Sequence, residues 1–239
     1  MRKTTVRLLT ASAGAAAAAA LGYAAYASTE WLRFGHAAGE TDNPHLDRFL
    51  PRFDIAETHE IAVAAPATDT FDAACGVDLR RSPVVRAIFR CRELFMRARR
   101  ADAPRRLFLD EMLSLGWGIL IREPGRRIVL GAVTQPWMAN VKFTAIPPEK
   151  FAAFGDSGFA KIVWTLEAQP VTESSSIFRT ETRAVTTDPE SRRRFRRYWS
   201  LASPGIRLIR CEALRLVKAA AERIAPGGVT TASASISPR

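Results

Sequence analysis

The segment from residue 178 to residue 210 constrains the fold most, because a strand pattern leads there directly into a long basic helix. Its sequence is FRTETRAVTTDPESRRRFRRYWSLASPGIRLIR. Thr187 and Glu190 have the spacing of a capping box, in which each side chain bonds a free backbone N–H at the helix start. Pro189 fits the first helical position because its φ angle is already helical. The segment therefore predicts an α+β domain in which a sheet feeds one long C-terminal helix.

The rest of the chain supplies the other elements of this domain. Alternation of apolar and polar residues predicts a first strand over 55–63, and helical periodicity follows at 67–75, 83–99 and 107–116. Further strands are predicted at 117–123, 126–133, 141–146, 160–169 and 177–186. The fold class is thus α+β, with about six antiparallel strands, two or three short helices after the first strand and the long C-terminal helix.

The N-terminus has the charge and hydropathy pattern of a membrane-targeting segment. Arg2, Lys3 and Arg7 precede an uncharged stretch over 8–27, which as a helix would just span a bilayer. We expect residues 1–28 to be a transmembrane anchor, with the folded domain on the extracytoplasmic side. Two alternatives stay open. A signal peptide cleaved after Ala27 would leave a secreted protein, and an alanine-rich soluble helix would not meet the membrane at all.

The remaining boundaries follow from changes in composition. Residues 29–53 are polar with scattered glycines, which indicates a linker in which His36 and His45 are solvated. Residues 54–225 form the single folded domain, a length that suffices for one core. Residues 226–239 are predicted to be a disordered tail.

The string ETRAVTTDPESRRRFRRYWSLASPGIRLIR, at 181–210, resembles the closing strand and helix of bacterial SRPBCC (START/polyketide-cyclase-like) proteins of unassigned function. Relatives of that branch often carry an N-terminal hydrophobic anchor. The resemblance implies a helix-grip fold, in which a curved antiparallel sheet wraps the C-terminal helix and encloses a hydrophobic cavity. It implies no particular reaction, because the superfamily includes lipid carriers, receptors and cyclases.

Apolar residues on the predicted strands and helix are the candidates to line such a cavity. The alternative for each is that it simply fills the core. The candidate ligand-binding residues are Trp117, Ile119, Leu130, Phe143, Ile162, Trp164, Leu166, Phe178 and Trp199.

Glu181 and Arg183 are the polar candidates for the same site. Residues two apart on a strand share a face, so the two side chains point the same way. On a concave face they would orient the polar end of a ligand, and Arg183→Ala would then lower ligand affinity. On a convex face they would form a solvated ion pair of little energetic value.

Nucleic acid is not an expected partner, although the chain has a net charge of +11 and an arginine run over 192–197. No helix-turn-helix or aromatic RNA-binding motif accompanies the run. A solvated helix face is the plain interpretation, and attraction to anionic lipid headgroups is the second.

Catalytic and cofactor motifs are nearly absent. His59 is the one histidine in the predicted domain, and no phosphate-binding glycine loop appears, so we expect no nucleotide cofactor and no metal. Cys75, Cys91 and Cys211 lie on apolar helix faces and read as buried thiols, with a Cys75–Cys91 disulfide as the alternative.

The sequence thus favours non-catalytic binding of a hydrophobic or lipid-like small molecule at the membrane. A first alternative is an enzyme of the cyclase or dehydratase type, with Glu181 or His59 as general acid or base. A second is a structural or interaction module with a filled core. Cavity volume separates binding from interaction, and a polar side chain inside the cavity separates enzyme from carrier.

Overall fold

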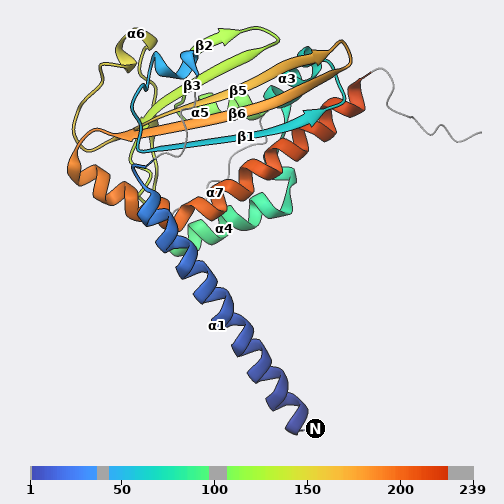
Figure 1. Cartoon of the computed structure of the whole chain (residues 1–239), viewed down its shortest axis with the longest axis vertical. Coiled ribbons are helices and arrows are strands. Elements are labelled where there is room, and N and C mark those ends of the chain that lie inside the picture. Colours follow the sequence, from blue (N-terminus) through green and yellow to red (C-terminus); the bar gives the residue numbers. More distant parts are fainter. Residues whose placement is uncertain (1, 37–42, 97–106, 226–239) are drawn as a thin grey trace, which may run out of the picture.

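The computed structural model describes residues 2–36, 43–96 and 107–225, and these form an α+β structure (Figure 1). A six-stranded antiparallel sheet packs against a long C-terminal helix, with short helices following the first strand, as the sequence predicts. This is the element order of the helix-grip fold that the resemblance implies. In chain order the elements are α1 (Arg2–Arg33), α2 (Pro44–Asp47), β1 (Ile55–Val63), α3 (Ala67–Gly76), η1 (Leu79–Arg81), α4 (Pro83–Met96), α5 (Phe108–Ser114), β2 (Gly118–Glu123), β3 (Arg127–Thr134), β4 (Phe143–Thr144), α6 (Pro148–Phe151), β5 (Ala160–Thr172), β6 (Ser175–Thr186) and α7 (Pro189–Ile224).

The sheet has the strand order β1-β6-β5-β3-β2, and the short β4 pairs with β3. The first strand therefore pairs with the last, with Ile55 opposite Ala184. The hairpin between β2 and β3 turns at Pro124-Gly125, between the strands predicted at 117–123 and 126–133, and Gly125 has a φ of 69°, a conformation that favours glycine. The helix α7 packs on one face of this sheet, which we call the inner face.

The inner face and the opposite, outer face of the sheet are both covered. On the inner face, Leu166 and Phe178 pack with α3 and with Leu214 and Val217 of α7. On the outer face, α2 and α6 cover the sheet (Figure 1). The cluster there consists of Leu46, Phe49, Leu50, Leu120, Val129, Phe151 and Val163. Because both faces are buried, apolar residues occur on both sides of the central strands.

The start of α7 differs from the predicted capping box by one residue. The N-cap is Asp188, whose Oδ1 accepts a hydrogen bond from the Ser191 backbone N–H at 2.8 Å. Thr187 instead bonds to the backbone of Phe159 in the loop before β5. The prediction of the helix was right and that of its cap was wrong, because Asp188 and Thr187 are both good cap residues and tertiary contacts engage Thr187.

The N-terminal segment is helical, and α1 runs away from the sheet and helices (Figure 1). Within 2–36, 43–96 and 107–225, no helix combines the length and apolar character that crossing a bilayer requires. The C-terminal part of α1 lies against α7, where Glu30 and Phe34 are buried.

The expected linker over 29–53 contains packed structure. Residues 29–33 belong to α1, and Leu46, Phe49 and Leu50 are buried on the outer face of the sheet. His45 is not simply solvated, because its Nε2 lies 2.7 Å from Nη1 of Arg127. The predicted tail, 226–239, lies outside the described residues.

Candidate ligand-binding site

Polar side chains gather on the inner face of the sheet, where the resemblance places a ligand cavity. Glu57 and His59 occupy every second position of β1 together with Ile55, Ile61 and Val63, so all five side chains point to the same side of the sheet. Thr182 and Thr180 lie opposite Glu57 and His59 on β6. Strands β1 and β6 thus place one carboxyl group and one imidazole group beside two hydroxyl groups.

Two arginines of α7 complete this group. Arg207 donates from Nε to Oε1 of Glu57 at 2.6 Å, and its Nη1 and Nη2 lie 3.0 and 3.1 Å from the carboxylate of Glu30 in α1. Arg210, one helical turn later, donates from Nη1 to Oγ1 of Thr182 at 2.6 Å. We call these residues the interior polar cluster: Glu57, His59, Thr180, Thr182, Arg207 and Arg210.

Two buried atoms of the interior polar cluster have no hydrogen-bond partner among the described residues. They are Oε2 of Glu57 and Nδ1 of His59. Buried polar atoms in native proteins are nearly always hydrogen bonded, to protein or to water. The interior polar cluster therefore has unused hydrogen-bonding capacity.

The charges around His59 keep its imidazole neutral at neutral pH. Burial lowers the pKa of His59 from 6.5, and the nearby guanidinium groups of Arg210 and Arg207 lower it further. Burial also lowers the pKa of Arg210 to about 10, against the opposing effect of the Glu57 carboxylate. Arg210 thus remains charged at neutral pH, whereas His59 is neutral.

The space between sheet and helix is small. A void of about 20 Å³ lies between α7 and the inner face, enough for a single water molecule. Trp164, Leu166, Phe178 and Val217 give it apolar walls, and Thr180 and Arg210 are its polar lining. This void is far smaller than the cavity implied by the resemblance, because aromatic and aliphatic side chains such as Phe108, Trp164 and Leu214 occupy the space around it.

A larger, open groove of about 530 Å³ lies between α3, η1 and the C-terminal end of α7. Its charged lining includes Asp78, Arg81 and Arg223. Val77 lines both this α3–α7 groove and the interior void, so the two spaces adjoin at this side chain. The apolar lining of the groove consists of Ala73, Val77, Leu107, Leu216, Ala220 and Ile224.

The structure brings together three of the nine predicted apolar residues, since Trp164, Leu166 and Phe178 line the void. Leu130, Trp117 and Ile119 pack instead with Phe71 and Leu109 in a neighbouring cluster. The remaining three predicted residues are core residues elsewhere, with Phe143 stacked on Trp117 and with Ile162 and Trp199 packed around Phe195.

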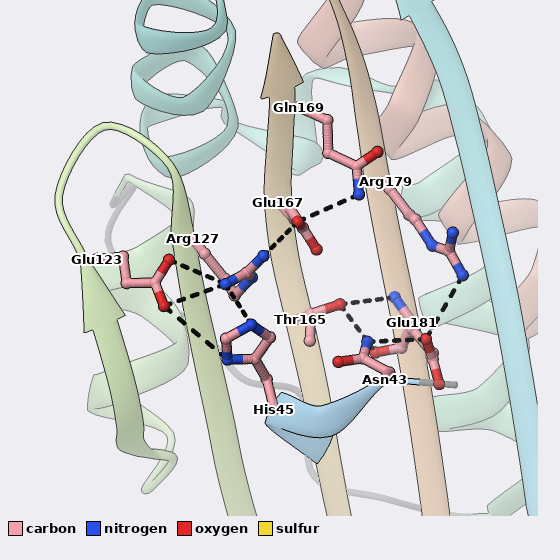
Figure 2. Close-up of polar contacts among 9 residues, drawn as sticks. All are labelled: Asn43, His45, Glu123, Arg127, Thr165, Glu167, Gln169, Arg179 and Glu181. Carbon is pink, nitrogen blue, oxygen red and sulfur yellow. Dashed lines mark hydrogen bonds and ion pairs between the residues drawn. The ribbon is translucent and has the colours of Figure 1, made fainter. Parts of the chain in front are cut away.

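Glu181 and Arg183 lie on the outer face of the sheet, not in the space beneath α7. Figure 2 shows Glu181 beside Asn43, the residue that precedes α2 and donates a hydrogen bond to its carboxylate. Arg183 donates from Nε to Oε1 of Glu181 at 2.9 Å and forms an ion pair of 2.5 Å with Asp47 of α2. Both side chains are fully buried, so neither predicted alternative holds: the pair is neither in the cavity nor solvated.

A second buried ion pair lies on the same face (Figure 2). Arg127 of β3 donates to Glu167 of β5 at 2.5 Å and also pairs with Glu123 at 2.9 Å. Burial raises the pKa of Glu167, but the hydrogen bonds from Arg127 and Gln169 outweigh it and hold this pKa below its usual value. These charges are paired beneath and beside α2, which indicates a structural role.

Sequence reasoning missed Glu57, Arg207 and Arg210. A signal was present for Glu57 and His59, because they share a period-2 face with the apolar residues Ile55, Ile61 and Val63. No comparable signal marked Arg207 and Arg210, since helical periodicity favoured Ile206 and Ile209 as the buried residues of that turn.

All three cysteines carry free thiols in the structure. Cys91 and Cys211 are exposed, in contrast to the predicted burial, and Cys75 is partly buried. Burial raises the pKa of Cys75 to about 11, and Asp72 contributes to this increase.

Comparison with known proteins gives distant likenesses in fold. No protein-family model matches the chain, and no curated protein matches it significantly. A protein from Thermobifida fusca is 18% identical with a TM-score of 0.30, over 70% of this chain and 91% of that one. Zhui aromatase/cyclase from Streptomyces sp. R1128 is 13% identical with a TM-score of 0.27, over 73% and 98%. Norcoclaurine synthase from Thalictrum flavum is 14% identical with a TM-score of 0.23, over 69% and 84%. At these values the likenesses carry no argument about the activity of this chain.

Proposed function

We propose that the protein binds a hydrophobic or amphiphilic small molecule, which enters through the α3–α7 groove and reaches the interior void. The observation that carries this proposal is the void itself, an apolar space with Arg210 and Thr180 at one side. Oε2 of Glu57 and Nδ1 of His59, which have no hydrogen-bond partner within the described part of the chain, lie in the adjoining cluster. An apolar pocket with a few convergent polar groups is the usual form of a small-molecule site.

The volumes determine how such a molecule must bind. The void holds about one water, so only the end of a ligand fits there, while its body occupies the groove of about 530 Å³. Val77 lines both spaces, and its side chain must move for the ligand to pass. Binding is therefore accompanied by a displacement at the end of α3.

The test is native mass spectrometry of the full chain after incubation with a total lipid extract. A stoichiometric adduct is expected for the wild type, and Val77→Trp should lose it because the larger side chain closes the passage. Val171→Trp is the matched control, since Val171 is exposed at the end of β5. A clean mass for the wild type, repeated after delipidation, would contradict binding and favour an interaction module with a filled core.

The second candidate is an enzyme of the cyclase or dehydratase type. His59 favours it, because its imidazole is neutral at neutral pH and its Nδ1 is unpartnered within the described structure. Glu181, the other candidate acid or base, lies on the outer face. An enzyme of the dehydratase type would release a bound ligand that has lost one water, and His59→Gln would release it unchanged. Identical ligand masses before and after binding to the wild type would exclude this reaction.

We also propose that the protein is located at the membrane, with the domain extracytoplasmic. Arg2, Lys3 and Arg7 before the uncharged stretch 8–27 support this location. Cell fractionation with a high-salt wash tests it. An anchored chain stays in the membrane pellet at full length, and a secreted one appears outside without its first residues. Full-length protein in the soluble cytoplasmic fraction would overturn the proposal.

A further inference from the structure

We propose that Arg210 is the recognition residue for a carboxylate at the end of the bound molecule, which makes the ligand an acidic amphiphile. This inference rests on the proposed function. It adds the chemical class of the ligand and the residue that selects it.

The polar lining of the void consists of hydrogen-bond donors. Arg210 has only donors, and one of them is used by Thr182. Thr180, the other polar residue of the void, already accepts a hydrogen bond from Nε1 of Trp164, which leaves its own O–H free to donate. A ligand end that enters the void therefore meets donors and must supply an acceptor oxygen.

The two arginines of the interior polar cluster differ in their partners. Arg207 has two carboxylates, at 2.6 Å from Glu57 and 3.0 Å from Glu30. Arg210 has no carboxylate within ion-pair distance in the described part of the chain. The Glu57 carboxylate raises the pKa of Arg210, but Arg207 holds Oε1 of that carboxylate.

A carboxylate suits this guanidinium better than a neutral oxygen does. A guanidinium in an apolar setting is costly unless it is paired, and charge-assisted hydrogen bonds are about twice as strong as neutral ones. The apolar lining of the α3–α7 groove, which includes Leu107, Leu216 and Ile224, suits an alkyl or aryl body. The ligand class is therefore a carboxylate with an apolar tail.

The experiment compares two probes with the same tail, dodecanoate and methyl dodecanoate, by calorimetric titration of the full chain in a nonionic detergent. Dodecanoate should bind roughly ten- to hundredfold more tightly, the effect of a hydrogen bond to a charged group. Arg210→Gln should remove this preference, so that the acid and the ester bind with similar affinity. Arg215→Gln, a charge-matched control on the exposed side of α7, should keep the preference.

The outcomes separate the two proposals. Equal binding of acid and ester would overturn the role of Arg210 while leaving small-molecule binding intact. Absence of binding for both probes, together with a clean mass after the lipid incubation, would overturn the proposed function and this inference with it. If Arg210→Gln does not fold, Arg210→Lys replaces it, and the acid should then keep a reduced preference because the ammonium retains the charge.

Discussion

His59 links the interior polar cluster to a pH dependence of stability. The unfolded chain takes up a proton near pH 6.5, whereas the folded protein resists protonation because the pKa of His59 is lowered. The free energy of unfolding should therefore fall as the pH decreases from 7 towards 5. His59→Gln should remove this part of the slope, measured by urea denaturation at several pH values.

The carboxylates do not interfere with this measurement of unfolding free energy against pH. The lowered pKa values of Glu167 and Glu222 start from 4.5, so their contributions are lost only at lower pH. His36→Gln is the control, because His36 is exposed near the end of α1. An unchanged slope in the His59 variant would contradict the assignment.

Arg183 is expected to matter for stability and not for ligand affinity. It is fully buried on the outer face and pairs there with Glu181, which is also fully buried. Arg183→Ala would leave a buried carboxylate without its main partner, at a cost of about 3–5 kcal/mol in the free energy of unfolding. Arg179→Ala is the matched control, since Arg179 is partly exposed and lies 3.7 Å from the same carboxylate. Chemical denaturation compares the two, and equal losses would contradict the placement.

The three thiols should differ in reactivity. Cys91 and Cys211 are exposed, and the raised pKa of Cys75 keeps its thiol protonated at neutral pH. Iodoacetamide at neutral pH should label Cys91 and Cys211 quickly, and Cys75 only after unfolding, as peptide mapping would show. If unfolding without a reductant leaves both Cys75 and Cys91 unlabelled, the predicted alternative of a disulfide between them holds instead.

At the scale of elements, the N-cap of α7 is Asp188, one residue after the Thr187 that the sequence pattern predicts. Asp188 accepts hydrogen bonds from the Ser191 and Gly158 backbone N–H groups, so it joins the helix start to the loop before β5. Asp188→Ala should lower the melting temperature clearly. Glu190→Ala should lower it little, because its ion pairs with Arg193 and Arg194 are exposed. A larger loss in the Glu190 variant would restore the predicted capping box.

The order of the elements could be predicted from the sequence, whereas the site largely could not. Alternation and cap signals define each strand and helix, but β6 has apolar residues on both faces, with Phe178 inside and Val185 outside. Alternation therefore predicts that Glu181 and Arg183 share a face, but it does not distinguish the inner face of the sheet from the outer face. The outer cover was missed because Leu46, Phe49 and Leu50 form too short a pattern in a polar context. Cavity size depends on how side chains interdigitate, which no periodicity reports.

At the scale of the whole molecule, α1 has two parts with different roles. Tyr23, Tyr26, Glu30 and Phe34 contact α7, whereas the N-terminal part of the helix extends away from the domain (Figure 1). A chain that begins at residue 23 should therefore keep the melting temperature of the full chain. A chain that begins at residue 37 should melt lower, because it lacks Glu30 and Phe34, which are buried. Equal melting temperatures for the two truncated chains would show that the docked part contributes nothing.

The sheet order has a consequence for folding while the protein is synthesised on the ribosome. The first strand to emerge, β1, stays unpaired until β6 has been synthesised, because the partner of Ile55 in the sheet is Ala184. The native contacts of β1 are thus among those most distant along the chain, and such contacts slow folding. The site between β1, β6 and α7 is therefore assembled last, after nearly the whole chain has been synthesised.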